Sequence, residues 1–361
     1  MGCNIVVGGQ YGSEGKGKVV ALNAALLEDP WVVRCGGPNS GHTVSIDGHE
    51  VILRQVPAGA GHPAAVLLLS AGCVLDEDIL LAELDELHIA RERIVVDPRA
   101  VLINASDREA EQSRVRRIGS TGSGTGTALI RRISREPGVI LADESERLKN
   151  RVCIESVAPR LHKHLDKGGD VIVEGTQGFG LSLLHGFHYP FVTSRDTTAA
   201  GFAMEVGLSP KQVDAITLVI RTFPIRVGGS SGPLKNEISW EEVQRLSDSP
   251  EPFPELTSVT RKLRRVARFD LEAVVAACKY NRPTSLAVMG LDRVDYRNRG
   301  VKSLAELTSQ IVGFLRGLER ETGVPVEWVG TGFSTGDAIH VSQSSQLREG
   351  RRVACEQGGN R

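Results

Sequence analysis

The amino-acid sequence predicts an α/β fold, with a mostly parallel, doubly wound central sheet and helices on both faces. Short apolar runs, typical of buried parallel strands, alternate with segments whose apolar residues recur at helical spacing. Several of these runs lead directly into polar, glycine-rich loops, and the chain contains 40 glycines. Because open α/β sheets bind ligands at the carboxyl edge of their strands, the pattern predicts a protein that holds ligands with backbone loops.

Length and composition narrow the class of protein. The chain has 361 residues, and we expect one large α/β domain over residues 1–341 and a polar tail over residues 342–361. The formal net charge of −1 gives no electrostatic case for nucleic acid or a membrane as a partner. Six cysteines without a C-x-x-C pair indicate a reducing cytosol. Without a leader-like N-terminus or an apolar run of about 18 residues, a cytoplasmic protein is expected.

The individual elements follow from local patterns. Asp47-Gly48 is a strong hairpin signal between residues 43–46 and 50–55. Other apolar runs predict strands over residues 3–7, 31–35, 66–69, 93–96, 171–173, 215–220, 285–289 and 326–329. Helical spacing predicts helices over residues 19–27, 76–87, 270–279 and 304–320.

Residues 10–18, Gln-Tyr-Gly-Ser-Glu-Gly-Lys-Gly-Lys, join the first expected strand to the first expected helix. This arrangement aims backbone N–H groups and a positive helix end at one point, where Lys16 and Lys18 add charge. The P-loop pattern is not met, because Gln10 stands where its first glycine belongs and Gly17 where its Ser/Thr belongs. Taken alone, the loop is equally compatible with a phosphate site and with a tight structural turn.

A second loop favours the phosphate site. The expected strand over residues 31–35 runs into Gly-Gly-Pro-Asn-Ser-Gly-His-Thr at residues 36–43. Two polar, glycine-rich loops that each directly follow a strand would lie side by side at the carboxyl edge of a parallel sheet. The two loops together therefore predict a phosphate-bearing ligand.

Residues 12–18 and 36–43 resemble the G-D-E-G-K-G-K and G-G-x-N-A-G-H-T signatures of adenylosuccinate synthetases. The resemblance extends with gaps from residue 3 to about residue 335. It implies a ligase that works in two steps on a purine 6-oxo group. A nucleoside triphosphate phosphorylates O6, and the amino group of L-aspartate then displaces that phosphate at C6. It also implies Mg²⁺ as the cofactor and a homodimer as the assembly.

The resemblance implies a triphosphate site with Lys16 and His42 beside the transferred phosphoryl group, where catalysis needs positioning and positive charge. The implied catalytic residues are Ser13, Lys16 and His42, and the implied Mg²⁺ ligands are Ser13 and Gly41. The implied triphosphate-binding residues are Gly12, Ser13, Glu14, Gly15, Lys16, Gly17, Gly41, His42, Thr43, Asp292 and Gly332.

Residues 113–135 place six arginines around a Gly/Ser/Thr-rich stretch. A flexible linker explains the stretch but not the arginines, which suit a phosphate site. The family's G-T-T-G-R-G-I-G-P-A run resembles this segment and implies that Thr121 holds a 5′-phosphate. Arg135 is then the residue that reaches the same phosphate across a dimer interface. The implied monophosphate-binding residues are Ser13, Asn39, Thr121, Arg135, Gln177 and Thr193.

A basic run near residues 260–265 is either a solvated face or an anion site. It resembles the family's T-T-G-R-R-R-R-x-G loop, which captures the carboxylates of aspartate. Thr260, Lys262 and Arg264 are the implied aspartate-binding residues, although the run is altered here.

Ser13 departs most from the family, which has an aspartate there that takes the N1 proton of IMP and ligates Mg²⁺. A serine hydroxyl can ligate Mg²⁺ but is a poor base near neutral pH. Either the protein is inactive, or its substrate differs next to N1, as guanine does. A bacteriophage branch, aminodeoxyadenylosuccinate synthetase, is also short, lacks this aspartate and acts on dGMP in making 2-aminoadenine DNA.

We therefore expect a homodimeric ligase that converts dGMP and L-aspartate to N6-succino-2-amino-2′-deoxyadenylate, in the host cytoplasm if a phage encodes it. The alternatives are an IMP enzyme that uses GTP and a nucleotide-binding regulator without turnover. Gly290 replaces the lysine of the family's T-K-L-D motif, whose aspartate, here Asp292, reads guanine. We expect ATP or dATP as the donor, because that change opens the base pocket.

Overall fold

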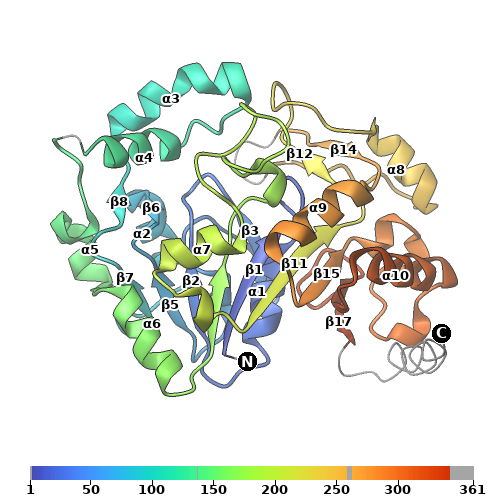
Figure 1. The fold of residues 1–361 in the computed structure, drawn as a ribbon, viewed down its shortest axis with the longest axis horizontal. Helices are drawn as coiled ribbons and strands as arrows, with labels where there is room; N and C mark the ends of the chain where they lie inside the picture. The colour runs from blue at the N-terminus through green and yellow to red at the C-terminus, as the bar shows by residue number, and fades with distance from the viewer. Residues whose placement is uncertain (1, 136, 258–261, 342–361) are drawn as a thin grey trace, which may run out of the picture.

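The computed structural model describes residues 2–135, 137–257 and 262–341. Its main sheet has ten strands in the order β17-β16-β15-β11-β1-β10-β2-β5-β7-β9 (Figure 1). Every neighbouring pair is parallel except β16 and β17. The strands are β1 (Cys3–Gly8), β2 (Trp31–Arg34), β5 (Val66–Leu69), β7 (Ile94–Val96), β9 (Cys153–Ile154), β10 (Val171–Glu174), β11 (Ala215–Arg221), β15 (Ser285–Met289), β16 (Val326–Gly330) and β17 (Ala338–His340). The predicted fold class is confirmed.

Helices cover both faces of this sheet. Alternate residues of β1 point to opposite faces, so Ile5 and Val7 join one core cluster and Val6 joins the other. The first cluster packs against α6 (Val157–Asp166), α7 (Ala199–Val206), α9 (Leu271–Asn281) and α10 (Ser309–Thr322). The second packs against α1 (Lys16–Ala24) and α2 (Glu77–Glu86). Burial on both faces explains why these strands are almost continuously apolar.

The remaining elements lie outside the ten-stranded sheet and its covering helices. Figure 1 shows α3 and α4 at the same end of the molecule as the small sheet that contains β12 and β14. These elements are β3 (His42–Ile46), β4 (His49–Leu53), β6 (Val74–Leu75), β8 (Val101–Leu102), α3 (Ala105–Ile118), α4 (Thr125–Ser134), α5 (Glu146–Arg151), β12 (Ile225–Arg226), β13 (Glu237–Ile238), α8 (Trp240–Ser247) and β14 (Arg265–Ala267). Short 3-10 turns are η1 (Ala58–Gly61), η2 (Arg91–Arg93), η3 (Ala142–Glu144), η4 (Phe179–Leu181), η5 (Pro210–Gln212), η6 (Leu291–Arg293), η7 (Tyr296–Asn298) and η8 (Leu304–Glu306).

Two helix predictions need correction. The helix predicted over residues 19–27 begins at Lys16, because Gly15 adopts φ 102° and turns the chain directly into α1. The helix predicted over residues 304–320 is two elements, η8 and α10. Asn298 accepts from the backbone N–H of Thr308 and donates to its hydroxyl, which holds Thr308 as an extended N-cap.

Residues 113–135 form the end of α3, a short loop and α4, so they are not a flexible linker. The predicted tail over residues 342–361 lies outside the described residues. Within the part of the chain that the structure describes, no helix has the length and apolar character needed to cross a membrane.

Candidate active site

The loop after β1 is held in shape by its own carboxylate. Glu14 Oε1 accepts from the backbone N–H groups of Gln10 (3.1 Å) and Gly12 (2.8 Å), and Oε2 pairs with Lys16 Nζ at 2.7 Å. Gly12 and Ser13 both have positive φ, +87° and +57°. The loop therefore presents Ser13 as an exposed side chain at its tip, while Glu14 and Lys16 are buried beneath it.

Lys16 links this loop to the next one in the sheet. Its Nζ also donates to the backbone carbonyl of Gln177, in the loop that follows β10. Because β1 and β10 are parallel neighbours, the loops after them meet at the carboxyl edge of the sheet. Of the two lysines that the sequence predicts to add charge at this edge, Lys16 lies at the base of the loop and is paired with Glu14, whereas Lys18 is directed to the carbonyls of Gly332 and Asp337.

Gly17 allows the loop at residues 36–43 to pack against α1. A Cβ at Gly17 would lie 2.7 Å from the Cβ of His42, a separation that no side chain tolerates. The two glycine-rich loops thus lie side by side, as the sequence predicts.

His42 is buried and belongs to a charged network with Glu174 and Arg34. Its Nδ1 contacts Glu174 Oε1, which also accepts from Arg34 Nη1 at 3.0 Å. Glu174 Oε2 accepts from the backbone N–H of Ala58 at 2.7 Å. With both oxygens of Glu174 engaged as acceptors, Nδ1 of His42 carries the proton that it donates.

The other ring nitrogen of His42 is available to a ligand. Nε2 is buried and has no hydrogen-bond partner among the residues that the structure describes. Burial and the Arg34 charge lower the pKa of His42 to about 4, although Glu174 acts in the opposite direction. His42 is therefore a neutral imidazole near pH 7, with Nε2 as an acceptor at the cavity wall.

A cavity of about 530 Å³ brings together many of the residues that the sequence singles out. It is lined from both glycine-rich loops, from α3 and α4, and from the segment before β14. The candidate residues on its wall are Gly12, Ser13, Asn39, Gly41, His42, Thr121, Gln177, Thr193, Lys262 and Arg264. Residues predicted for the monophosphate and for aspartate thus share one cavity.

Other candidate residues lie away from this wall. The carboxylate and ammonium of Glu14 and Lys16 face each other inside the first loop, next to the backbone of Gly15 and Gly17. Thr43 is in β3, while Asp292 and Gly332 follow β15 and β16 at the same sheet edge. Arg135 is exposed at the end of α4, and Thr260 lies outside the described residues.

Two cavity residues escaped prediction as site residues. The Arg226 guanidinium lies 4.6 Å from the ring centroid of Tyr11, and both side chains line the cavity. Burial raises the pKa of Tyr11, partly offset by Arg226. The aromatic residue directly before Gly12 was the available sequence signal.

A partly buried ion cluster also escaped prediction. Glu255 contacts Arg221 Nη2 at 2.5 Å and Arg293 Nη2 at 2.7 Å, and Arg221 Nη1 donates to the Ser13 carbonyl at 3.0 Å. Burial raises the pKa of the Glu255 carboxyl, but Arg221 and Arg293 outweigh it and hold it at about 2. Through this hydrogen bond from Arg221, the cluster fixes the backbone carbonyl of Ser13.

Comparison with known proteins identifies the family. The sequence profile described as adenylosuccinate synthetase matches residues 5–152 and 140–299. The chain belongs to the adenylosuccinate synthetase family. The adenylosuccinate synthetase of Methanocaldococcus jannaschii is 39% identical over 354 residues, covering 96% of this chain and 97% of the relative. The protein is thus a ligase of the type that joins aspartate to a purine nucleotide.

Two solved structures share the fold. The fully ligated adenylosuccinate synthetase of Plasmodium falciparum has a TM-score of 0.82 and 18% identity, covering 93% of this chain and 99% of that one. The succinoaminodeoxyadenylate synthetase of cyanophage S-2L has a TM-score of 0.79 and 29% identity, covering 94% of this chain and 95% of that one. The cyanophage protein was solved bound to dGMP and to dATP as an energy donor.

Adenylosuccinate synthetases use Mg²⁺, and the oxygen donors of this cavity suit that ion. The Ser13 hydroxyl and the Gly41 carbonyl belong to residues on the cavity wall. No group of three or more His, Cys, Asp or Glu residues that could hold a metal occurs among the described residues. A small donor set fits Mg²⁺, which commonly takes one or two protein ligands and completes its shell with water and substrate phosphates.

Proposed function

We propose that this protein joins L-aspartate to C6 of dGMP, with hydrolysis of ATP or dATP, and forms N6-succino-2-amino-2′-deoxyadenylate. The observation that carries the proposal is Ser13, an exposed hydroxyl at the tip of the first loop. In the family's IMP enzymes a carboxylate at this position takes the proton from N1. Guanine differs from hypoxanthine by a 2-amino group at that edge, which Ser13 leaves room to accept.

No other carboxylate replaces the missing one. Among the described residues that line the cavity, Glu111 is the sole acidic side chain. Its two oxygens accept from the backbone N–H groups of Gly124 (2.5 Å) and Gly126 (2.9 Å) at the start of α4. Glu111 is therefore committed to the loop before α4 and does not serve as a base beside N1.

His42 supplies the proton acceptor in this proposal. As O6 of dGMP attacks the γ-phosphorus of the donor, the nucleoside diphosphate leaves. The N1 proton passes to Nε2 of His42, which has no partner among the described residues. Glu174 stabilises the resulting imidazolium through Nδ1–H. The protonated Nε2 can then donate to the new 6-phosphoryl oxygen and give its proton to the phosphate that aspartate displaces.

The other candidate residues bind and orient the reactants. We assign the 5′-phosphate of dGMP to Asn39, Thr121, Gln177 and Thr193, with Ser13 at the purine edge; all five line the cavity. Lys262 and Arg264 line it from the segment before β14 and suit the carboxylates of aspartate. Thr260 belongs to the same proposed aspartate site.

The triphosphate is assigned to the first loop and the start of α1, where Gly12, Glu14, Gly15, Lys16 and Gly17 shape the site. Thr43 completes it beside His42, and Asp292 and Gly332 border the base. Mg²⁺, held by Ser13 and Gly41, would neutralise charge on the phosphate oxygens when bound.

A homodimer completes the proposed site. Arg135 is exposed and does not line the cavity of its own chain. On the same helix, Ile130 and Ile133 are also exposed, and Leu184 is exposed on the loop that follows η4. Exposed apolar side chains on the helix that ends at Arg135 suit a second copy of the chain. In that arrangement Arg135 reaches the 5′-phosphate bound by the partner subunit.

The relatives support both the proposal and its main alternative. The cyanophage enzyme, bound to dGMP and dATP, favours dGMP as substrate and dATP as a donor. The archaeal adenylosuccinate synthetase, at 39% identity, favours an IMP enzyme that uses GTP. We prefer dGMP because Ser13 replaces the family's carboxylate and leaves room beside N1 for the 2-amino group that distinguishes guanine from hypoxanthine.

A mass-spectrometric assay tests the proposal. The protein is incubated with Mg²⁺, L-aspartate and each pair of dGMP or IMP with ATP, dATP or GTP. The succinyl product is expected from dGMP with ATP or dATP. A product from IMP and GTP alone would contradict the proposal, and binding of nucleotides without any product would indicate a regulator.

A further inference from the structure

Lys18 points away from the phosphate loop to which the sequence assigns it. It is buried in the first turns of α1, with 6% of its surface exposed. Its Nζ donates to the backbone carbonyls of Asp337 (2.7 Å) and Gly332 (3.1 Å). Both carbonyls belong to the loop at residues 331–337, between β16 and β17. Lys18 therefore joins α1 to that loop.

The loop at residues 331–337 is closed on itself and held from three sides. Thr331 N–H donates to the Asp337 carbonyl at 2.9 Å, which ties the two ends together. From the β3–β4 hairpin, Ser45 N–H donates to the Thr335 hydroxyl at 2.8 Å. From the surface, Lys302 Nζ contacts the Asp337 carboxylate at 2.8 Å. Of the contacts from these three sides, the one made by Lys18 comes from a buried side chain.

The ammonium of Lys18 is buried and donates to backbone carbonyls, which indicates a structural role. Burial lowers the pKa of Lys18 to about 8, while Asp337 and Asp292 act in the opposite direction. A buried ammonium depends on its hydrogen bonds, so each carbonyl that it holds is held firmly. Asp292, which is assigned to the donor's base, is one of the charges that raise the pKa of Lys18.

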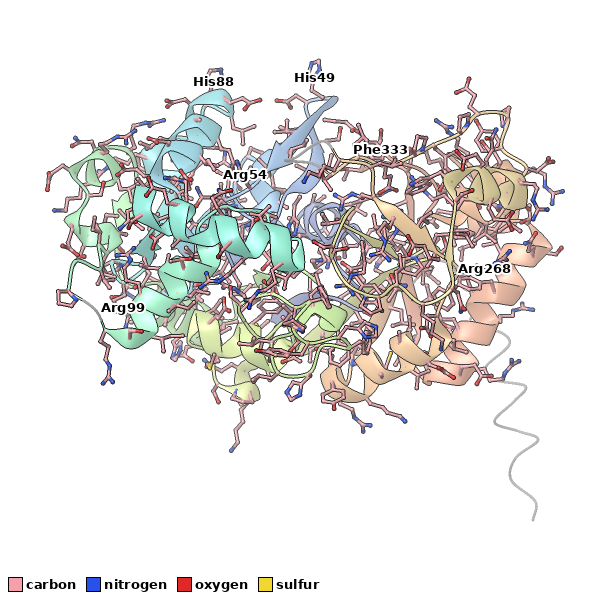
Figure 2. All side chains as sticks on the ribbon, turned by 90° about the horizontal axis from the view of Figure 1, so that it is seen from above. His49, Arg54, His88, Arg99, Arg268 and Phe333 are labelled. Carbon is pink, nitrogen blue, oxygen red and sulfur yellow. The ribbon has the colours of Figure 1, made fainter. Side chains whose placement is uncertain are left out.

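The loop that Lys18 holds presents one exposed aromatic side chain. Phe333 is 66% exposed, and Figure 2 shows it beside the hairpin that carries His49. Gly332 precedes it, and a Cβ at Gly332 would lie 2.6 Å from Asp337 Oδ2. The loop is thus tightly folded, with an aromatic ring next to the proposed base position.

We infer that Lys18 is a positioning residue for the base of the donor nucleotide, and not a ligand of its phosphates. It fixes the loop at residues 331–337 to α1, whose N-terminus faces the phosphate loop. One helix then sets the spacing between the base and the phosphates, which preorganises the donor site. The inference rests on the proposed function in one respect: Asp292 and Gly332 are taken to border the donor's base.

Two ligands separate the roles, one with a nucleoside and one without. Binding of inorganic tripolyphosphate and of the β,γ-imido analogue of ATP is measured by calorimetry, with Mg²⁺, for the wild type and Lys18→Met. We expect the variant to bind the imido analogue roughly tenfold more weakly, while tripolyphosphate changes less than about twofold. Equal weakening of both ligands would show that Lys18 binds phosphate, and an unchanged pair would show that the loop does not need Lys18.

These measurements need neither dGMP nor aspartate, so their outcome is independent of whether the proposed reaction occurs. If the wild-type protein binds tripolyphosphate as tightly as it binds the β,γ-imido analogues of both ATP and GTP, no nucleoside is recognised and the inference is overturned.

Lys302→Met is the matched control, since Lys302 holds the same loop from the exposed side. It is expected to change either affinity by less than about twofold, as exposed ion pairs contribute little. Should Lys18→Met fail to fold, Gly332→Ala displaces the loop without removing a charge, because its Cβ would meet Asp337. Gly332→Ala is expected to weaken binding of the imido analogue and to leave binding of tripolyphosphate unchanged. The reverse pattern would contradict the inference.

Discussion

Ser13 combines a left-handed backbone, with φ +57°, and a hydroxyl where the family has a carboxylate. Aspartate also tolerates positive φ, so the backbone does not explain the substitution. The proposed function does, because in it the hydroxyl keeps an oxygen for Mg²⁺ but gives up the carboxylate beside N1.

Ser13→Asp is expected to restore little turnover of IMP. The basic run at residues 261–265 is altered as well, so the carboxylate alone does not rebuild an IMP enzyme. We expect kcat/KM for IMP to stay at least about a hundredfold below the wild-type value for dGMP. Steady-state rates with each nucleotide measure this, with Ser13→Ala as the variant that removes the oxygen. IMP turnover within tenfold of that value would contradict the account.

Glu174→Gln is expected to lower kcat at least about tenfold with little change in the KM for dGMP. The amide is neutral and does not stabilise a protonated His42. It also leaves Arg34 without a buried counter-charge, at a cost on the order of 3 kcal/mol of folding free energy.

Glu83→Gln controls for the loss of stability. Glu83 is a buried carboxylate too, and it accepts from the backbone N–H groups of Arg54, Gln55 and Val56. Chemical denaturation and steady-state kinetics of both variants separate the two effects. Equal losses of kcat in both variants would show that Glu174 has only a structural role.

At the scale of elements, the strands and the two glycine-rich loops were predictable because each is a local pattern. The break between η8 and α10 was not, since it depends on Asn298 reaching Thr308. The Arg34–Glu174 pair was also hidden. The two residues are direct neighbours only because β2 and β10 pair in that register, across 140 positions of sequence. The Glu255 cluster depends in the same way on tertiary packing.

The loop after β15 determines the expected donor. Gly290 has φ +81°, and a Cβ there would lie 3.1 Å from Thr222 Oγ1, so the family's lysine does not fit without a shift. In the proposed donor site, the absence of this lysine leaves the base pocket open on that side, and we expect ATP or dATP to be preferred over GTP. Values of kcat/KM for the three donors, at saturating dGMP and aspartate, test this. A preference for GTP of tenfold or more, about 1.4 kcal/mol, would show that Asp292 alone still selects guanine.

At the scale of the whole molecule, one edge of the main sheet gathers the loops after β1, β2, β10, β15 and β16. This arrangement follows from the parallel order of the strands and was predictable from the sequence. A contribution from a second chain is a prediction that rests on the resemblance alone, because an exposed arginine has no pattern of its own.

A mixture of Arg135→Ala and Lys16→Ala proteins is expected to recover activity that neither variant has alone. Each hybrid dimer would hold one site with both an intact Lys16 and an intact Arg135 from the other chain. The rate after subunit exchange is compared with that of each variant alone. If exchange is demonstrated and no activity returns, Arg135 acts in its own chain or has no part in the site.

The central claim is the choice of dGMP over IMP, and direct competition tests it most closely. Equal concentrations of the two nucleotides are supplied in one reaction with L-aspartate, Mg²⁺ and ATP, and repeated with GTP, and both succinyl products are followed by mass. The account predicts that dGMP is consumed at least about a hundredfold faster, a difference of about 2.7 kcal/mol in transition-state free energy. Consumption of IMP at a comparable or higher rate, with either donor, would contradict it.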